Sequence, residues 1–325
     1  MSVLTPQQRT ALEKAVIDAR KKVEAGAFNA LHNIAVDNPE PFAHMTPEER
    51  ALRNNLRSKA RLLGDALAAN GTQEISHLAY ELAYEIWHKM LFAKFLEANG
   101  LLMHTDGVAV TMADCEELAK EEGYSDKWDA AASYASKMLP AIFRVDDPLM
   151  QVTFATEDKI KLEELIDSIE KQIFISDDSL GWVYQYWQSE AKKTVEEDEK
   201  SGQKIDGARL PAKTQLFTEP YMVQFLIDNT LGAWWVSRNP HVRPPVKFEY
   251  LRMHKLNTDG TTDAEGIKDN ESCRSVAEPD AGKFTGWPDK TKDITSLDPC
   301  MGSGHFVASL FTVFATLRMY EEGLS

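Results

Sequence analysis

The sequence predicts a mainly α-helical N-terminal domain, residues 1–200, followed by the beginning of a Rossmann-like α/β domain, residues 201–325. Two observations predict this fold class. Helix-start signals and apolar residues at helical spacing recur through the first 200 residues. Toward the C-terminal end, a short apolar segment, a glycine loop and a long apolar helix follow one another, which is the order that opens a doubly wound α/β domain. The length of 325 residues also fits two domains.

Local signals predict where several helices begin and which helix lies at the centre. Thr5-Pro6 and Thr46-Pro47 each place a capping hydroxyl directly before a proline, a residue favoured in the first helical turn. Residues 74–98 are apolar nearly all round, so this segment is expected to form a centrally buried helix. Residues 179–190 predict an aromatic-rich helix, whereas the charged, glycine-containing residues 191–213 predict an exposed linker or loop.

Glycines are expected to end two of the helices. Apolar residues recur on one face of the first helix before Gly26, and a helix predicted over 221–231 is followed directly by Gly232. Residues 243–292 include a stretch rich in Thr, Asp and Gly that predicts a long insertion or loop. Residues 294–297, which begin with Ile and end with Leu, then predict a short strand.

The composition limits the class of protein. The chain carries 36 basic and 51 acidic side chains, a formal charge of −15, and residues 105–200 alone hold 23 acidic and 10 basic ones. An acidic chain repels nucleic acid on average. The acidic block is either a docking surface for a basic partner or a solvated face, and we favour the second.

No apolar run of about 18 residues predicts a membrane span, no N-terminal secretion signal is present, and the three widely spaced cysteines predict no disulfide framework. A cytoplasmic protein without a bound metal is expected, because the eight histidines show no paired spacing.

The glycine loop at residues 298–304 is where the sequence predicts ligand binding. Asp298 stands at the end of the predicted strand, the edge at which doubly wound folds bind ligands. Gly302 and Gly304 let a ligand approach the backbone, and the next helix directs its N–H groups to the same place. A P-loop needs Lys and then Ser or Thr after the second glycine, where this sequence has His and Phe. A nicotinamide fingerprint needs a third small residue where this sequence has valine.

The same loop resembles a known cofactor-binding motif. Asp298-Pro299-x-x-Gly302-Ser303-Gly304-x-Phe306 is similar to motif I of the amino-methylating DNA methyltransferases. In those enzymes the loop wraps the methionine part of S-adenosylmethionine (AdoMet), and the Phe packs near it. Near 214–232, Phe217-Thr218-Glu219-Pro220 resembles motif X of the same enzymes, with Glu219 inserted before the proline. The resemblance implies that Thr218 caps the helix and reaches the methionine carboxylate, whereas a plain glycine turn and a plain capped helix are the structural alternatives. The implied cofactor-binding residues are Phe217, Thr218, Asp298, Pro299, Gly302, Gly304 and Phe306.

Longer segments resemble one methyltransferase family. Residues 85–97, 179–188, 214–223, 229–235 and 297–306 are similar to the PglX family, the adenine-specific DNA methyltransferases of BREX phage-defence systems. This resemblance implies an AdoMet-dependent enzyme that transfers the methyl group to the exocyclic amine (N6) of adenine. It also implies double-stranded DNA as the substrate and other BREX proteins as partners.

The catalytic motif of this family, Asn/Asp-Pro-Pro-Tyr/Phe, does not occur in the sequence. Asn38-Pro39-Glu40-Pro41-Phe42 has an intervening Glu, and Asn239-Pro240-His241 lacks the second proline and the aromatic ring. No catalytic residue is therefore assigned. We expect the chain to be the N-terminal part of such an enzyme, truncated after motif I at 294–306 and inactive alone. The alternative is a non-catalytic helical interaction module that assembles with other defence proteins.

Basic and aromatic clusters complete the set of candidate surfaces. Four arginines at helical spacing form either a stripe that contacts phosphate or, as we favour, a solvated face: Arg50, Arg53, Arg57 and Arg61. A second basic cluster either contacts DNA or a partner subunit or is simply solvated: Arg238, Arg243, Lys247, Arg252 and Lys255. The clustered aromatic residues are expected to pack in the core rather than to stack on bases: Trp182, Tyr184, Tyr186, Trp187, Trp234 and Trp235.

Overall fold

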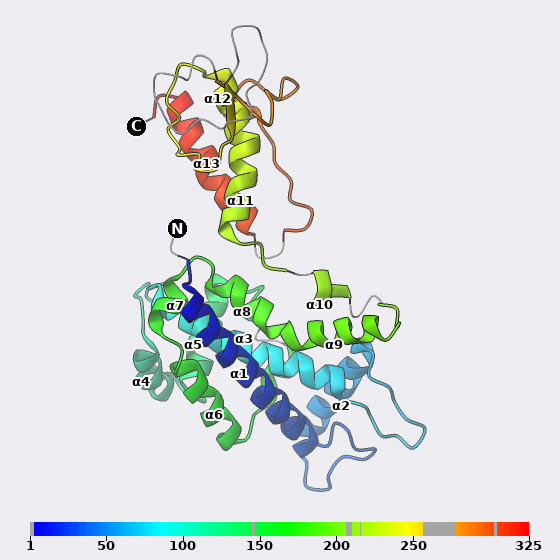
Figure 1. The fold of residues 1–325 in the computed structure, drawn as a ribbon. Helices are drawn as coiled ribbons and strands as arrows, with labels where there is room; N and C mark the ends of the chain where they lie inside the picture. The colour runs from blue at the N-terminus through cyan, green and yellow to red at the C-terminus, as the bar shows by residue number, and fades with distance from the viewer. Residues whose placement is uncertain are drawn as a thin grey trace. The chain divides into compact units, whose positions relative to one another are not determined.

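The computed structural model describes residues 3–144, 147–205, 210–214, 216–255, 277–301 and 304–324. The chain forms two compact units, Met1–Lys213 and Thr214–Ser325, and each is described here by itself (Figure 1). The boundary between the units follows Lys213, whereas the sequence predicts a domain boundary after residue 200.

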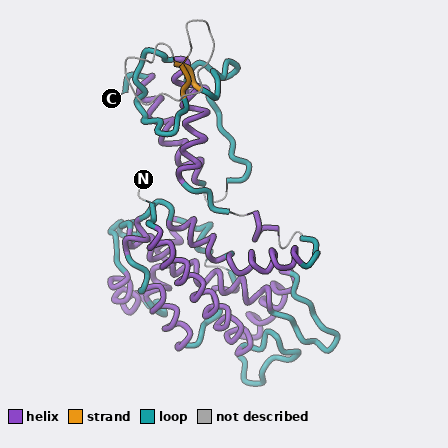
Figure 2. Tube along the Cα trace, in the orientation of Figure 1, coloured by secondary structure: helices purple, strands orange, loops and turns teal. Residues whose placement is uncertain are grey.

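The first unit is built from helices and the loops that join them (Figures 1 and 2). In chain order its helices are α1 (Pro6–Asn33), α2 (Pro47–Leu63), α3 (Ser76–Ala98), α4 (Met112–Glu122), α5 (Lys127–Met138), the 3-10 segment η1 (Pro148–Gln151), α6 (Thr156–Asp167), α7 (Lys171–Ile175), α8 (Ser179–Trp187) and α9 (Ser189–Lys200). The short helix α10 (Leu210–Thr214) lies at the boundary between the units.

The two predicted helix starts are confirmed. Thr5 accepts a hydrogen bond from the backbone N–H of Gln8 at 3.3 Å, and Thr46 accepts one from the backbone N–H of Glu49 at 3.2 Å. In each case the side-chain oxygen of the residue three positions into the helix accepts a hydrogen bond from the N-cap backbone N–H, which completes a capping box. These starts depend on four consecutive residues, so the sequence alone specifies them.

Helix α3 lies at the centre of the first unit, as its apolar sequence predicts. It contacts α1, α2, α5 and α7. Leu78 and Leu82 lie on one face of this helix and Trp87 and Leu91 on the opposite face, and all four expose 1% or less of their surface. A helix that is apolar all round needs neighbours on several sides, and here it has them.

The segment after α8 corrects the prediction of an exposed linker. Residues predicted as a loop over 191–213 form most of α9, whose single buried apolar residue is Val195 at 4% exposure. Glu, Lys and Ala are strong helix formers, so a charged stretch can be helical when one apolar contact anchors it. An ion pair of 2.6 Å between Lys213 and Glu199 ties α10 back to α9.

Gly26 does not end the first helix, because α1 continues to Asn33. A Cβ atom at Gly26 would lie 2.9 Å from Cε2 of Phe154 and 3.3 Å from Cβ of Asp158. The glycine is therefore where α1 approaches the start of α6 most closely, and its role is to leave space rather than to terminate the helix.

For two of the four arginines on α2, Arg53 and Arg57, the structure corrects both interpretations made from the sequence. Arg53 and Arg57 expose only 4% and 9% of their surface. Arg53 donates to the carbonyl of Ala35 at 2.7 Å, Arg57 donates to the carbonyl of Val36 at 2.7 Å, and both donate to the carbonyl of Asn38. These guanidinium groups hold the loop after α1 from inside the unit, so they form neither a solvated face nor a phosphate-binding stripe.

The second unit contains fewer elements. They are α11 (Pro220–Ile227), the π-helical segment η2 (Asp228–Gly232), α12 (Ala233–Arg238), β1 (Met253–Lys255), β2 (Ala277–Pro279), the 3-10 segment η4 (Thr291–Asp293) and α13 (His305–Glu321). The two strands pair antiparallel, with Met253 opposite Pro279, and Figure 2 shows them as the short orange segments. Gly232 was expected to end a helix, but the helix passes through it into α12.

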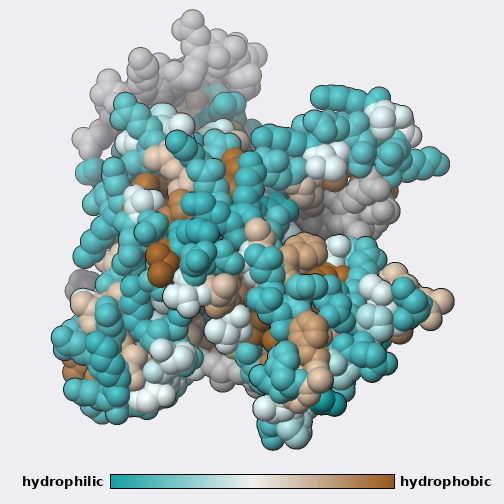
Figure 3. Space-filling model, turned by 90° about the horizontal axis from the view of Figure 1, so that it is seen from below, coloured by the Kyte–Doolittle hydropathy of each residue, from teal (hydrophilic) through white to brown (hydrophobic). Residues whose placement is uncertain are grey.

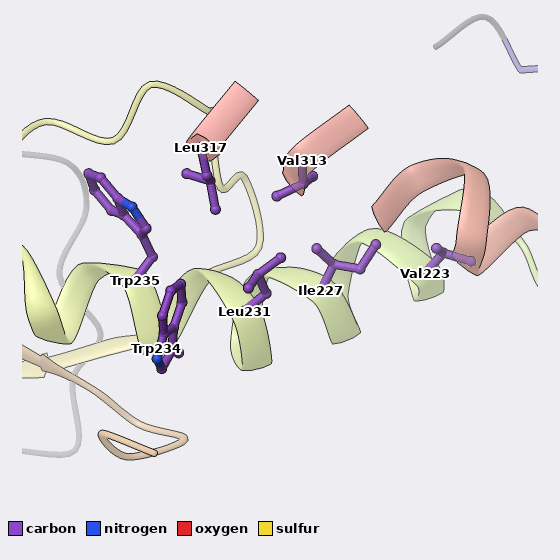
Figure 4. Close-up of a cluster of buried hydrophobic side chains, with 7 residues drawn as sticks. All are labelled: Val223, Ile227, Leu231, Trp234, Trp235, Val313 and Leu317. Carbon is purple, nitrogen blue, oxygen red and sulfur yellow. The ribbon is translucent and has the colours of Figure 1, made fainter. Parts of the chain in front are cut away.

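The core of the second unit lies between α13 and the continuous run of α11, η2 and α12. Figure 4 shows Val313 and Leu317 of α13 directed toward the opposite helical run. That run contributes the buried side chains Val223, Ile227, Leu231, Trp234 and Trp235. The spacing of four residues places Val223, Ile227 and Leu231 on one helical face, and Trp234 and Trp235 follow on the next turn. The expected core positions of Trp182, Trp187, Trp234 and Trp235 are confirmed, since each exposes at most 8%.

The predicted strand at 294–297 is not formed. Ile294 has an extended backbone, with φ −79° and ψ 132°, but no described strand pairs with the segment. Leu297 exposes 88% of its surface, whereas a strand of a doubly wound sheet is covered on both faces. The protein is mainly helical in its described parts, and the Rossmann-like sheet stays a prediction.

The face of the molecule drawn in Figure 3 is mainly polar. Figure 3 shows one face of the molecule, on which apolar residues form separate patches among hydrophilic ones. None of the helices in the described part of the chain combines the length and the apolar character needed to cross a membrane.

Candidate cofactor site

Two segments that the sequence predicts to bind one cofactor meet in the second unit. Phe217 precedes α11, and His305 is the first residue of α13. Their ring centroids lie 4.7 Å apart, with the rings at 68°, an edge-to-face contact. The motif X segment therefore lies against the start of the helix that follows the motif I loop.

The start of α13 is open and has a specific backbone requirement at Gly304. Gly304 has φ +81°, a left-handed conformation, and its N–H donates to the carbonyl of Met301 at 2.9 Å. Among the described residues, a Cβ atom there would meet Cγ of Met301 alone, at 4.0 Å, so the left-handed dihedral angle is what requires the glycine. As the N-cap of α13, Gly304 has no side chain to accept from the first-turn N–H groups.

Asp298 and Pro299 form the turn that leads toward this helix. Oδ1 of Asp298 accepts a hydrogen bond from the backbone N–H of Cys300 at 3.0 Å, which makes an Asx turn. Asp298 is half-buried, whereas Pro299 and Cys300 are exposed. The other predicted glycine of the loop, Gly302, lies outside the described residues.

The structure changes the roles predicted for Thr218 and Phe306. Thr218 was expected to cap the following helix, but Glu219 is the N-cap residue and Pro220 the first helical residue. Because the proline fixes the start of the helix, the inserted glutamate moves Thr218 one position away from the capping site. Phe306 is half-buried and packs against the core cluster of α11, α12 and α13, so part of its ring surface is used in packing.

Sequence reasoning missed a polar pair in the π-helical segment, in which Asp228 is buried and Asn229 half-buried. The Asp228 side chain is fully buried, and its carboxylate accepts from Nε2 of Gln224 at 2.6 Å and from the backbone N–H of Tyr250 at 2.8 Å. Asn229 donates to the carbonyl of Tyr250 at 2.8 Å and accepts from the N–H of Arg252 at 3.0 Å. Together they fasten the segment before β1 to the helix. The available signal was an Asp-Asn pair inside an otherwise apolar helix.

Burial raises the pKa of Asp228, and the hydrogen bonds from Tyr250 and Gln224 oppose that effect only in part. The folded protein therefore binds a proton at this site at higher pH than the unfolded chain does. The resulting stability is absent at high pH, appears as the pH falls through the raised pKa, and is complete below the ordinary value of about 3.9.

We expect Asp228→Asn to remove this gain in stability at low pH, because the amide is neutral throughout and a turned Gln224 can still bond it. Urea unfolding at pH 7.5 and at pH 4.5 checks this: the wild type should gain stability relative to Asp228→Asn at the lower pH, and an unchanged difference contradicts it.

The second basic cluster is partly structural. Arg238 donates to the carbonyl of Trp287 at 2.8 Å and lies over the ring of Trp234, 5.1 Å from its centroid. Arg252 lies 5.1 Å from the ring centroid of Phe225. Contact of the cluster with DNA or a partner subunit stays a prediction for its more exposed members.

The described residues of this region offer groups for binding rather than for bond making. An aromatic pair, the open first turn of a 17-residue helix and the Asp298 carboxylate lie in the segments that motif X and motif I contribute. A helix N-terminus attracts an anionic group, and a carboxylate attracts a cationic group or accepts from a hydroxyl or amine. These groups are of the kinds that would bind a small ligand with both charges and an aromatic or apolar part.

Comparisons with known proteins give two curated relatives. The chain is 26% identical to the adenine-specific methyltransferase PglX of Lacticaseibacillus casei (strain Zhang), over 317 aligned positions that cover 84% of this chain and 25% of that protein. It is 29% identical to the adenine-specific methyltransferase BrxX of Escherichia coli O9:H4 (strain HS), over 188 positions that cover 57% of this chain and 14% of that protein. No protein-family profile matches the chain, and no solved structure matches it.

The similarity to PglX includes most of this chain, so it takes in the helical first unit as well as at least part of the second. The chain spans about a quarter of the length of that relative and a smaller share of BrxX. It is thus similar, over most of its own length, to PglX-like adenine-specific methyltransferases.

Proposed function

We propose that this chain forms part of an AdoMet-dependent DNA methyltransferase that acts on the exocyclic amine (N6) of adenine. The contact between Phe217 and His305 is the observation that carries the proposal. It brings the motif X segment to the start of the motif I helix, an arrangement that a plain glycine turn and an unrelated capped helix do not require. The names of both curated relatives support the same activity.

The residues present fit AdoMet in kind. The first-turn N–H groups of α13, which Gly304 leaves without a side-chain cap, would receive the cofactor's carboxylate. Asp298 would attract a positively charged or hydroxyl group of the cofactor, and Phe217 would cover an apolar part. Phe306 would line the same region with the ring surface that its core contacts leave exposed. AdoMet supplies an electrophilic methyl group, so this chain's contribution is binding and orientation.

The substrate and the partners belong to the same proposal. The target would be adenine in double-stranded DNA, taken out of the base stack for methylation, and other BREX defence proteins would be the partners. We assign no catalytic residue, because the Asn/Asp-Pro-Pro-Tyr/Phe motif does not occur in the sequence. We propose that the chain alone does not methylate DNA. Incubating it with labelled AdoMet and an adenine-containing duplex tests that part, and label in the DNA above background contradicts it.

Replacement of Asp298 tests the cofactor site. Asp298→Ala is expected to weaken binding of S-adenosylhomocysteine, the product form of the cofactor, by about tenfold, as for the loss of one charge-assisted hydrogen bond. Titration calorimetry of the 325-residue chain measures this. Asp289→Ala is the matched control, because Asp289 lies in the same unit with a side chain that is 98% exposed. Equal affinity for the wild type and Asp298→Ala, or the same loss in Asp289→Ala, rejects the assignment of this loop.

A further inference from the structure

A small cavity that is partly open to solvent lies in the first unit, and none of its lining residues belongs to the segments of the candidate cofactor site. It has a volume of about 180 Å³ and lies between α3, the start of α5, the η1 segment and α6. Much of its wall is apolar: Met90, Trp128, Leu149 and Leu162 line it and expose 8% or less of their surface. An apolar cavity of about 150 Å³ is large enough to hold benzene. This cavity therefore has room for one small ring or a branched aliphatic group.

Lys89 of α3 brings a positive charge to the cavity wall. In the part of the chain that the structure describes, its ammonium group makes no hydrogen bond and no ion pair. Burial lowers the pKa of Lys89, and the carboxylates of Glu85, Asp129 and Asp147 oppose this without reaching ion-pair distance. A partly buried ammonium without a partner raises the free energy of the folded state. An anionic ligand atom beside it would lower that free energy.

The other charged groups near Lys89 already have partners. Glu85 pairs with Arg144 at 2.8 Å, and Asp147 pairs with Lys59 at 2.6 Å.

Two more charged groups in the cavity wall, Asp126 and Lys159, pair with each other. Asp129 is exposed and accepts from the backbone N–H of Ser125 at 3.2 Å. Lys89 is therefore the cavity cation that is left for a ligand.

We propose that this cavity binds a small monocarboxylate with an aromatic or branched aliphatic body, whose carboxylate accepts from Nζ of Lys89 while the body fills the apolar part. A single negative charge suits the site better than a phosphate, because Lys89 is the one lining ammonium without an ion-pair partner among the described residues, and several carboxylates lie near it. The inference is independent of the proposed methyltransferase function, since every residue involved belongs to the first unit.

Calorimetry with three chemically matched probes tests the proposal. Phenylacetate, phenylacetamide and phenethylamine have similar bodies and differ in charge. Phenylacetate is expected to bind the 325-residue chain about tenfold more tightly than phenylacetamide, the effect of one hydrogen bond to a charged group, and phenethylamine should not bind. In Lys89→Met the preference for the carboxylate should disappear, whereas Lys22→Met, at an exposed position of α1, should keep it.

A measurement of stability and a cavity-filling variant separate loss of the binding site from loss of folding. Lys89→Met should not lower the melting temperature, because it removes a partly buried charge without a partner, so lost binding in this variant cannot be ascribed to unfolding. Ala132→Phe places a ring in the cavity from a lining residue that exposes 8%, and it should abolish phenylacetate binding. Equal affinity for phenylacetate and phenylacetamide, or undiminished binding in Lys89→Met, overturns the proposal and leaves water as the occupant beside Lys89.

Discussion

Replacing Arg57 by methionine is expected to destabilise the first unit by about 3 kcal/mol, the cost of leaving several buried carbonyl groups without a charged donor. Arg57 donates to Val36 at 2.7 Å, to Asn38 at 2.6 Å and to Gly71 at 2.8 Å. It thereby connects α2 to two different loops. Methionine keeps most of the apolar stem but offers no donor, so the carbonyls of Val36 and Gly71 would lose this partner, whereas Arg53 would still bond the carbonyl of Asn38.

Two variants of the same helix separate this mechanism from a general effect of removing charge. Arg61→Met removes an exposed guanidinium that bonds only side chains, Gln73 at 3.2 Å and Ser58 at 3.0 Å, so it should change the free energy of unfolding by less than about 0.5 kcal/mol. Arg57→Lys keeps the charge but cannot reach three carbonyls in two loops at once, so its stability should lie between those of the wild type and Arg57→Met.

Urea unfolding of the 325-residue chain, followed by circular dichroism, measures these differences. Hydrogen exchange adds a local measurement, because the loop after α1 should lose protection in Arg57→Met while α4 keeps it. A similar loss in Arg57→Met and Arg61→Met would mean that the arginines act through net charge, and that the burial of Arg57 contributes little.

Features that depend on a few neighbouring residues could be predicted from the sequence. The capping boxes at Thr46 and Thr5 require only a hydroxyl, a proline and the residue three positions into the helix. The central position of α3 follows from apolar residues on every side of one helix. Motif I and motif X are short as well, so the sequence could predict the two segments that meet where Phe217 lies against His305, and cofactor binding by them stays a prediction.

Features that depend on a distant part of the chain could not be predicted. The spacing of Arg53 and Arg57 suits a solvated stripe equally well, and only the loop folded onto α2 buries them. The Ile294–Leu297 segment has a strand-like composition, but a strand also needs a neighbour to bond, and none lies beside it in the described residues. Glycine is the most ambiguous residue, because one residue type serves helix ends, left-handed turns and close contacts. Gly304 is a left-handed N-cap, whereas Gly26 and Gly232 provide space within helices.

Because Gly232 provides space within a helix, replacing it is expected to have a large effect on the free energy of unfolding. A Cβ atom at this position would lie 2.9 Å from Cδ1 and 3.0 Å from Cγ of Phe248, closer than atoms can approach without displacement. The ring cannot simply rotate away, because both of these atoms are near its attachment point. We therefore expect Gly232→Val to destabilise the second unit by about 3 kcal/mol through overpacking. This cost should exceed the gain of less than about 1 kcal/mol in helix propensity.

Gly286→Val is the matched control, since Gly286 belongs to the same unit and a Cβ there would have no atom within 4 Å. It should change the free energy of unfolding by less than about 0.5 kcal/mol. Combining Gly232→Val with Phe248→Ala should cost less than the sum of the two single changes, because the smaller side chain provides the space that valine needs. Hydrogen exchange localises the effect: amides of α11 and α12 should lose protection in Gly232→Val and recover part of it in the double variant. Simple additivity of the two changes would mean that the contact with Phe248 is not what excludes a side chain at this position, and the π-helical backbone itself would then be the constraint.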